Sequence, residues 1–420
     1  MANEPEQTET QNELISLDKA QRRLSFWKRL SLIGLALLVV LSGTTFLAFR
    51  VFHQNTAPTY MVAAHSTILS NSNGAMFGFD LQRTHFNPSE HIITTANVSR
   101  LVVSWSVSTG NVIISSPTIA DGMVYAGSFD GTLYAWNAST GKIVWTAHTT
   151  DSIGSSPALA QGIVYVGSDD HKLYAFNART GTLLWSALTG GDIWSSPVVA
   201  HGVVYVGSND DRLYAFNELT GAILWTYTTA NLVSSSPTVY SGMVYVGSED
   251  DKLYALDAAT GKLRWATHVN LPIRISSPAI VDGVVYVGSE DGQLYAFDAR
   301  TGSIKWTAQT KGFIHSSPAV ANGIVYIGST DHALYAFDAS TGKRRWVAFS
   351  GDVIDSSPTV ANGVVYVGSQ DYKLYAFDAQ KGKMLWSYTT GDGIDSSPMI
   401  INGTVYVGSW DGKLYAFHLA

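Results

Sequence analysis

One phrase of about 40 residues recurs eight times between residues 115 and 420, and it constrains the fold more than any other feature. It begins with Ser-Ser-Pro, continues through Val-Tyr-Val-Gly-Ser and Leu-Tyr-Ala-Phe, and ends in Thr-Gly-x-x-x-Trp. The prolines of the phrase are Pro117, Pro157, Pro197, Pro237, Pro278, Pro318, Pro358 and Pro398. A period of this length is typical of a repeat architecture in which each repeat forms one supersecondary unit.

Each repeat contains four strand signals: a short run after Ser-Ser-Pro, the two aromatic-containing runs, and a run that ends in tryptophan. β-Branched and aromatic residues favour strands, and pairs such as Asn322-Gly323 between the first two runs predict tight hairpins. Proline is tolerated only at an edge, which predicts that the first strand is innermost and turns a free edge toward a central channel.

The two ends of the chain predict a closed ring. The last repeat stops at Ala420, after its third strand, and the missing fourth strand occurs at residues 101–105 (LVVSW), ahead of the first Ser-Ser-Pro. Pairing of these ends removes exposed sheet edges. We therefore predict an all-β fold for residues 77–420: an eight-bladed β-propeller with four-stranded antiparallel blades, in which the N-terminal strand closes the last blade.

The N-terminal region predicts a membrane anchor. Residues 1–29 are polar and end in a basic cluster, whereas residues 30–49 carry no charge. Twenty residues in a helix span about 30 Å, the thickness of a bilayer core. A cleaved signal peptide is the alternative, but its apolar region is normally about 7–15 residues long. The basic cluster before the apolar run predicts that residues 1–29 lie in the cytoplasm. We therefore expect a single transmembrane helix at 30–49, a linker at 50–76 and a propeller outside the cytoplasm.

Composition narrows the possible functions. The net charge is −7 and only 14% of residues are charged, so nucleic-acid binding is not expected. The absence of cysteine excludes disulfides, thiolate metal sites and cysteine nucleophiles. We expect a monomer that reaches the cell membrane through its own helix.

Residues 175–185 (AFNARTGTLLW) resemble the tryptophan-docking motif, AxDxxTGxxxW, of the pyrroloquinoline-quinone (PQQ) repeat superfamily, and close copies lie at 135–145, 255–265, 296–306 and 336–346. The resemblance implies that one tryptophan per blade packs between neighbouring blades. These residues are Trp105, Trp145, Trp185, Trp225, Trp265, Trp306, Trp346 and Trp386. It also implies one of two functional classes, because the superfamily contains dehydrogenases that bind PQQ and Ca²⁺ as well as non-catalytic BamB-like scaffolds and sensors.

The repeats differ from one another almost only on one face of the predicted ring. We call it the variable face; in the first repeat it comprises residues 109–117 and 128–131. The opposite turn face comprises residues 121–122 and 137–142 of that repeat and their equivalents. Three residues before each proline, at the mouth of the channel, stand Ile114, Gly154, Trp194, Ser234, Ile275, His315, Asp355 and Asp395. Rigid scaffolds place function on variable loops, so a ligand or partner is expected here.

Four carboxylates and an imidazole are candidates for a binding site on this face: Asp352, Asp355, Asp392 and Asp395 with His315. If they gather on one arc, Asp355 and Asp395 could hold Ca²⁺, which takes 6–8 oxygen ligands. The alternative is that they form solvated, hydrogen-bonded turns.

Three further side chains complete the candidate surface. Trp194 could stack on a flat ring, pack among loops or contact a partner. Arg274 lies in the one inter-blade loop with an extra residue and could pair with an anionic ligand or a neighbouring acid. Trp410 lies in a loop of the same face. An aspartate that recurs in every such loop, as at Asp170 and Asp210, is interpreted as turn-forming.

The regular spacing favours a binding function over catalysis. Quinoprotein dehydrogenases are similar but generally longer, with insertions that build the cofactor pocket, whereas the inter-blade spacing here never changes by more than one residue. No c-type haem motif is present either. We expect a non-catalytic scaffold that binds a protein or cell-envelope ligand, without a cofactor. The alternatives are a PQQ- and Ca²⁺-dependent alcohol or sugar dehydrogenase, or a small-ligand sensor.

Overall fold

The computed structural model describes residues 75–420. The predicted tail, the predicted membrane-spanning helix at 30–49 and most of the predicted linker lie outside these residues. Within residues 75–420, no helix has both the length and the apolar character that crossing a membrane requires.

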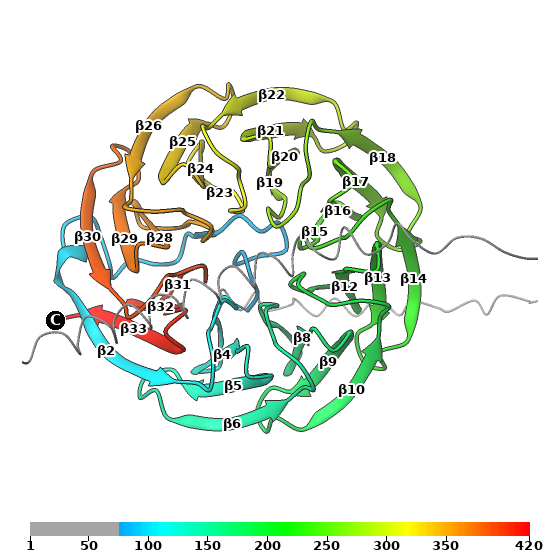
Figure 1. The fold of residues 1–420 in the computed structure, drawn as a ribbon, viewed down its shortest axis with the longest axis horizontal. Helices are drawn as coiled ribbons and strands as arrows, with labels where there is room; N and C mark the ends of the chain where they lie inside the picture. The colour runs from blue at the N-terminus through cyan, green and yellow to red at the C-terminus, as the bar shows by residue number, and fades with distance from the viewer. Residues whose placement is uncertain (1–74) are drawn as a thin grey trace, which may run out of the picture. The chain divides into compact units, whose positions relative to one another are not determined.

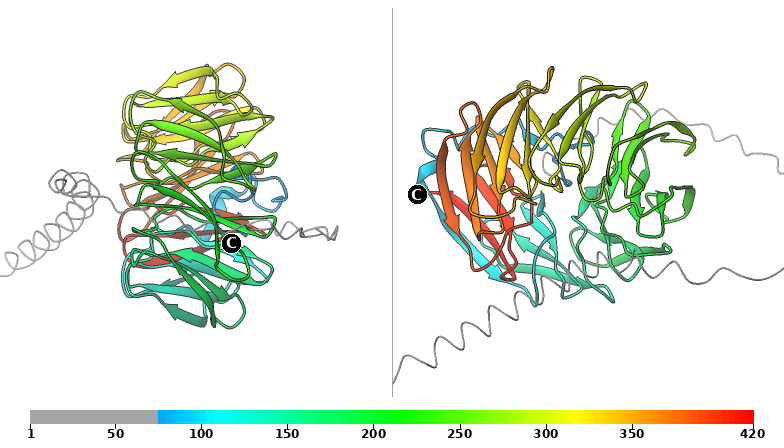
Figure 2. Two further views of the ribbon diagram at one scale, coloured as in Figure 1. Left: turned by 90° about the vertical axis from the view of Figure 1, so that its right-hand side faces the viewer. Right: turned by 45° about the horizontal axis from the view of Figure 1, so that its top comes forward.

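Eight blades, each of four antiparallel strands, surround a central channel (Figure 1), and side-on the ring is a disc one blade deep (Figure 2). One of the eight sheets gains a fifth strand, described below. Along the chain, the first seven blades are β3 (Thr118–Ala120), β4 (Met123–Gly127), β5 (Thr132–Asn137), β6 (Ile143–His148); β7 (Ala158–Ala160), β8 (Ile163–Gly167), β9 (Lys172–Asn177), β10 (Leu183–Leu188); β11 (Val198–Ala200), β12 (Val203–Ser208), β13 (Arg212–Asn217), β14 (Ile223–Thr228); β15 (Thr238–Tyr240), β16 (Met243–Ser248), β17 (Lys252–Asp257), β18 (Leu263–His268); β19 (Ala279–Val281), β20 (Val284–Gly288), β21 (Gln293–Asp298), β22 (Ile304–Gln309); β23 (Ala319–Ala321), β24 (Ile324–Ser329), β25 (Ala333–Asp338), β26 (Arg344–Phe349); and β27 (Thr359–Ala361), β28 (Val364–Gly368), β29 (Lys373–Asp378), β30 (Met384–Thr389).

The eighth blade joins the two ends of the described chain. It consists of β31 (Met399–Ile401), β32 (Thr404–Gly408), β33 (Lys413–Leu419) and, outermost, β2 (Leu101–Ser108). β2 runs antiparallel to β33, and Figure 1 shows the cyan strand beside the red one. The predicted propeller, its blade count and its closure are confirmed.

Tryptophans connect each blade to the next. The indole N–H of Trp145, for example, donates to Ala178 O of the following blade at 2.9 Å. Its ring lies against Gly181, which has φ +72° and where a Cβ would stand 2.6 Å from the ring. Only glycine fits this position without strain. The same bond joins Trp105 to Ala138, Trp185 to Glu218, Trp225 to Ala258, Trp265 to Ala299, Trp306 to Ala339, Trp346 to Ala379 and Trp386 to Leu101.

A ring of hydrogen bonds encircles the channel at the level of the Ser-Ser-Pro phrases. The second serine of each phrase donates its backbone N–H to the hydroxyl of the same serine in the next blade, at 2.9–3.1 Å. In order around the ring these residues are Ser116, Ser156, Ser196, Ser236, Ser277, Ser317, Ser357 and Ser397. The repeated serines are thus explained by architecture.

The channel is filled by the chain itself, which corrects the expectation of free inner edges. Residues 75–87 lie inside the ring (Figure 1), and β1 (Phe86–Asn87) pairs with the inner strand β27. Carbonyls of this channel segment accept N–H groups from five inner strands, the donors being Leu159, Val239, Ile280, Val320 and Val360. Ala75 and Met76, predicted to be linker, therefore belong to the propeller. The chain then crosses the turn face, and a 3-10 turn, η1 (Val98–Arg100), leads into β2.

A buried arginine holds the channel segment. Arg83 is fully buried, and its guanidinium donates to four carbonyls: Pro237 O at 2.7 Å, Ser196 O at 2.8 Å, Phe77 O at 2.9 Å and Pro197 O at 3.3 Å. Three of these acceptors belong to Ser-Ser-Pro phrases. Arg83 therefore attaches the segment to the Ser-Ser-Pro phrases of two blades.

Candidate functional site

Two residues of each repeat build the mouth of the channel on the variable face. One precedes Ser-Ser-Pro and the other follows the Gly-Ser of the loop between the second and third strands. The inter-blade loop is fixed by an isoleucine or valine packed on a strand glycine. At Gly167, for example, a Cβ would stand 2.2 Å from Ile193. The next residue, here Trp194, consequently takes a fixed place at the mouth.

One side of the mouth is apolar. Trp194 packs edge-to-face against Phe129, with ring centroids 5.9 Å apart. Gly154 lies between them, since a Cβ there would be 3.4–3.5 Å from Phe129, Trp194 and Ile114. We call these four residues the apolar arc. Trp194 is half-buried and contacts a loop aromatic.

The other side carries a chain of charged contacts between residues of four blades. Arg274 Nε lies 3.5 Å from Glu249 Oε2 and 3.3 Å from Glu290 Oε1. Glu290 Oε1 is also 3.4 Å from His315 Nε2, and His315 Nδ1 is 3.0 Å from Asp355 Oδ1. We call these five residues the polar arc. Arg274 pairs with neighbouring acids, one of the two roles that the sequence left open.

The polar arc keeps its histidine charged. Burial by itself would lower the pKa of His315, but Asp355 and Glu290 outweigh it and raise that pKa to about 9. Burial likewise tends to raise the pKa of Glu290, and the contacts with His315 and Arg274 shift it below its ordinary value. The imidazolium therefore links blades 5, 6 and 7 at neutral pH.

Polar contacts continue on both sides of this arc. Ser234 Oγ lies 3.1 Å from both Asn209 Oδ1 and Glu249 Oε1. Beyond Asp355, Trp410 Nε1 donates to Asp395 Oδ2 at 2.7 Å, and Gln370 donates to the other oxygen of the same carboxylate. Asp395 is therefore held by its own neighbours.

The extra residue in blade 5 changes which side chain reaches the mouth. Counting back from the proline selects Ile275, but Ile273 packs on Gly247 as Ile193 packs on Gly167. The insertion therefore follows Ile273, and Arg274 stands where Trp194 stands in blade 3. The arginine, rather than Ile275, joins the mouth of the channel.

Among the four carboxylates and the imidazole, His315 and Asp355 contact each other. Asp352 is 44% exposed and lies 3.7 Å from His332, whereas Asp392 is buried and accepts the N–H of Gly393 at 2.8 Å. Within residues 75–420, no group of three or more His, Asp or Glu side chains is arranged to hold a metal ion.

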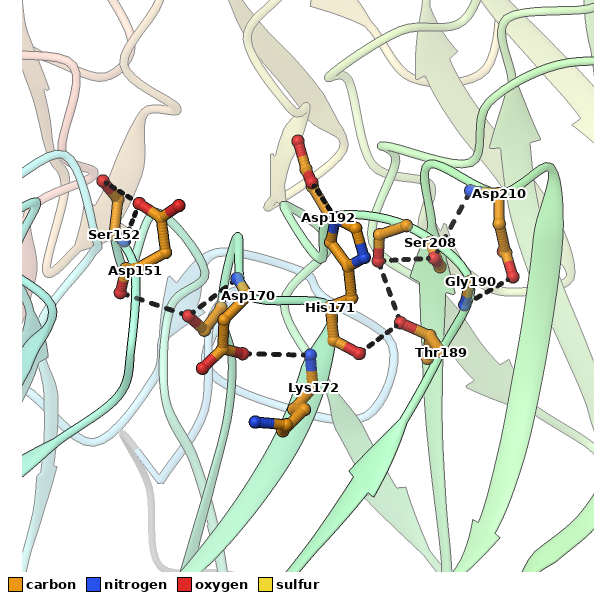
Figure 3. Close-up of polar contacts among 12 residues, drawn as sticks. Asp151, Ser152, Asp170, His171, Lys172, Thr189, Gly190, Asp192, Ser208 and Asp210 are labelled. Atoms are coloured by element: carbon orange, nitrogen blue, oxygen red, sulfur yellow. Dashed lines mark hydrogen bonds and ion pairs between the residues drawn. The ribbon is translucent and has the colours of Figure 1, made fainter.

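The repeated loop aspartates stabilise turns, as Figure 3 shows for blades 2 and 3. Asp210 accepts the N–H of Gly190 from the neighbouring loop at 2.8 Å, and Asp170 accepts the N–H of Lys172 at 3.1 Å. Each of the eight aspartates also accepts a tyrosine hydroxyl four residues later. Their turn-forming role is confirmed. Between these turns, His171 Nε2 lies 3.0 Å from Asp192 Oδ1.

Five mouth residues were not predicted: Phe129, Asn209, Glu249, Glu290 and Gln370. All follow the repeated Gly-Ser. This position also varies from repeat to repeat, so the variation that singled out the residues before Ser-Ser-Pro could have found them.

The mouth does not fit PQQ with Ca²⁺. The candidate Ca²⁺ ligands Asp355 and Asp395 contact different partners, and the candidate stacking residue Trp194 packs on Phe129. The channel below is occupied by residues 75–87.

The family model described as outer membrane protein assembly factor BamB, a PQQ-repeat model, matches residues 94–193, 187–277, 271–353 and 349–420. These matches cover almost the whole propeller. The chain belongs to the BamB-like PQQ-repeat family.

Solved structures from both branches of the superfamily share the fold of this BamB-like chain. BamB from Moraxella catarrhalis is 23% identical with a TM-score of 0.65, covering 76% of this chain and 97% of that one. A europium-containing methanol dehydrogenase is 17% identical (TM-score 0.74; 82% and 98%). A quinohemoprotein alcohol dehydrogenase from Comamonas testosteroni is 18% identical (TM-score 0.70; 82% and 80%). No curated protein sequence matches the chain. At these identities the structures establish the fold alone.

Proposed function

We propose that this BamB-like propeller is a non-catalytic binding protein, anchored in the cytoplasmic membrane by residues 30–49, which holds a protein partner on its variable face outside the cytoplasm. The observation that carries the proposal is the mouth itself. Its variable side chains contact one another as an apolar and a polar arc, above a channel filled by residues 75–87.

The chemistry of the mouth supports a protein partner. The apolar arc offers half-buried aromatic rings, and aromatic residues are enriched in protein interfaces. The polar arc is rigid, because each charged group already has partners and loses little freedom on binding. Because residues 75–87 occupy the channel, the mouth presents a surface. A quinone-dependent dehydrogenase would need a pocket at this place.

Exchanging residues between repeats tests the proposal. Trp194→Gly introduces the residue of blade 2, and Asp395→Ile that of blade 1, so each new residue already occurs at this position of the repeat. We expect affinity capture of the full chain from envelope membranes to recover a specific protein, which the exchanged variants lose although they still unfold cooperatively. Lys262→Ala, on the turn face, is the matched control.

Capture that both exchanged variants retain would contradict the assignment of the face. The dehydrogenase alternative has its own test, in which the purified chain is titrated with PQQ and Ca²⁺ and assayed for dye-linked alcohol oxidation. We expect neither stoichiometric binding nor oxidation, and either result would overturn the non-catalytic function.

A further inference from the structure

The outer strands of the propeller differ around the ring in a way that the fold does not require. In blades 4–6, the residue just before the docking tryptophan is cationic and contacts an aspartate of the preceding turn. These ion pairs are Arg264–Asp257 at 2.7 Å, Lys305–Asp298 at 3.8 Å and Arg345–Asp338 at 2.6 Å. Charges of this kind are a common protection for an exposed sheet edge.

Blades 1–3 replace both members of this pair. The turn aspartate becomes Asn137, Asn177 or Asn217, and the cation becomes an aliphatic residue that follows a second aliphatic residue. The resulting surface, which we call the apolar rim, consists of Ile143, Val144, Leu183, Leu184, Ile223 and Leu224. Each is between 48% and 55% exposed. Exposed aliphatic pairs on the outer strands of three neighbouring blades are a candidate contact surface.

The charges next to the apolar rim are basic. Lys142 and Arg179 lie in the turns that lead into it, and the strands β6, β10 and β14 contain no Asp, Glu, Lys or Arg. Glu218, the acid in these same turns, is buried at 2% exposure. The rim therefore offers aliphatic side chains flanked by cations.

The two sides of the ring differ in charge. The turn face, taken together with the outer-strand residues that directly follow its turns, carries more bases than acids. The bases are Lys142, Arg179, Lys262, Arg264, Arg300, Lys305, Lys343, Arg344, Arg345, Lys381 and Lys383, and the acids are Asp121, Glu218, Asp257, Asp282, Asp298, Asp338 and Asp378. The acids of the variable face are Asp130, Asp151, Asp169, Asp170, Asp192, Asp210, Asp211, Glu249, Asp250, Asp251, Glu290, Asp291, Asp331, Asp352, Asp355, Asp371, Asp392, Asp395 and Asp411, and they outnumber its bases. An anionic surface repels the variable face and favours approach from the opposite side.

We propose that the apolar rim, with Lys142 and Arg179, rests on the anionic surface of the lipid bilayer. This inference depends on the proposed membrane anchor. Aliphatic side chains beside lysine and arginine suit the boundary between headgroups and acyl chains. About 25 residues separate the predicted span from Ala75, and such a segment reaches at most ~80–90 Å. A linker of this length allows the rim to reach lipid, and the repelled variable face would remain accessible.

The strand geometry favours lipid over an added β-strand. The register of each outer strand shifts next to the exposed pair, as between Leu183 and Trp185 in β10. Such a bulge disrupts the ladder and bends the strand, which disfavours pairing with a new strand at that point. It also explains why two consecutive side chains are both exposed.

The absence of cysteine allows a clean test with the full chain in lipid nanodiscs. Single cysteines replace Thr182 in blade 2 or the equivalent Ser303 in blade 5, and each carries a fluorophore. In nanodiscs of phosphatidylcholine and phosphatidylglycerol with spin-labelled lipid, we expect strong quenching at position 182 and little at position 303. With phosphatidylcholine alone, the quenching at 182 should fall at least about twofold, because the basic residues lose their anionic partners.

A control variant gives blades 1–3 the pairs that blades 4 and 6 carry naturally. It combines N137D/V144R, N177D/L184R and N217D/L224R, so the fold tolerates each pair by precedent. We expect this variant to keep its thermal stability and to lose the quenching at 182. Equal quenching at 182 and 303 would overturn the proposal. Self-association of the chain through the apolar rim, measured by analytical ultracentrifugation, would also overturn it. A chain that leaves the nanodisc would contradict the anchor. Partner capture by the variable face is measured separately, so failure at the rim leaves that function standing.

Discussion

His315 is a loop residue whose side chain connects three neighbouring blades. Its two ring nitrogens contact Asp355 and Glu290, and Glu290 also contacts Arg274. A buried imidazolium is stable only with such partners. The repeat places a different side chain at this position in most other blades, so the same backbone supports both an apolar and a charged arc.

The pKa of His315 predicts a pH-dependent stability. The histidine binds its proton more tightly in the folded chain, with a pKa of about 9, than in the unfolded chain, where it is about 6.5. Its contribution is therefore complete below pH ~6.5 and is lost as the pH rises through about 9. We expect a loss of up to ~3 kcal/mol across this range. Denaturant unfolding at several pH values measures it; a His315→Gln variant that keeps the same slope would contradict the prediction.

Tyr366 gives a second prediction at this scale. In blade 6, Tyr326 donates its hydroxyl to Ala379 O of the next blade at 3.0 Å, whereas the buried hydroxyl of Tyr366 has no hydrogen-bond partner within residues 75–420. Blade 8 lacks the turn that would supply the acceptor, because its outer strand comes from the N-terminus. Burial raises the pKa of Tyr366, so the phenol stays neutral.

We expect Tyr366→Phe to leave stability unchanged or to raise it, because it removes an unsatisfied polar group. Tyr326→Phe should cost ~1 kcal/mol, because it removes a hydrogen bond. Thermal unfolding of the two variants provides the comparison, and equal losses would contradict the prediction.

At the scale of elements, the repeated strands could be predicted from the sequence and the channel segment could not. Tight turns such as Asn322-Gly323, with φ of +52° and +74°, are local features. The burial of Arg83 is not local, because its acceptors Ser196 O and Pro237 O lie more than 100 residues away. The amino-acid sequence does not show which backbone carbonyls will accept a hydrogen bond from Arg83. The first residues of the channel segment, Ala75 and Met76, were therefore predicted to be part of the linker.

The same distinction applies to the candidate site. The sequence predicts that the loops around Asp352 and Asp355 lie on one face. The partners of each side chain, however, depend on neighbouring blades, as the contact of Asp352 with His332 illustrates. The spacing of the repeat predicts on which face of the ring a loop residue lies. It does not predict which residue of a neighbouring blade that side chain contacts.

The channel segment yields a prediction for Arg83. Arg83→Met removes four hydrogen bonds from a charged donor and leaves buried carbonyls, so we expect a local loss of ~2–4 kcal/mol. The amides of Val239, Ile280 and Val320, which donate to this segment, should then exchange hydrogen faster. Unchanged exchange at these amides would contradict the role of Arg83.

At the scale of the whole molecule, the pairing of β2 with β33 determines whether the ring stays closed. Val102 and His418 are opposite each other in this pairing, and both are exposed. A V102C/H418C disulfide would join strands that are more than 300 residues apart in sequence. We expect it to raise Tm by about 5–10 °C, because a long loop is closed in the unfolded chain. The reduced variant is the control, and an equal Tm in both states would contradict the role of this pairing in stability.

The whole ring also explains how a regular scaffold can be specific. Tryptophans, serines and loop aspartates repeat because they hold the blades together, which leaves the mouth residues free to differ. The difference in charge between the two faces favours one orientation of the ring toward an anionic surface. Because residues 75–87 occupy the channel, the mouth presents a surface to a partner. The proposed function and the proposed lipid contact therefore use different parts of one rigid body.

Site-specific photo-crosslinking in living cells tests the central claim most directly. A benzoylphenylalanine replaces Trp194 at the mouth or Ser303 on the turn face of the full chain. We predict that the probe at 194 joins the chain to one discrete protein and that the probe at 303 does not. Equal crosslinking at the two positions, or none at 194, would contradict a binding function of the variable face.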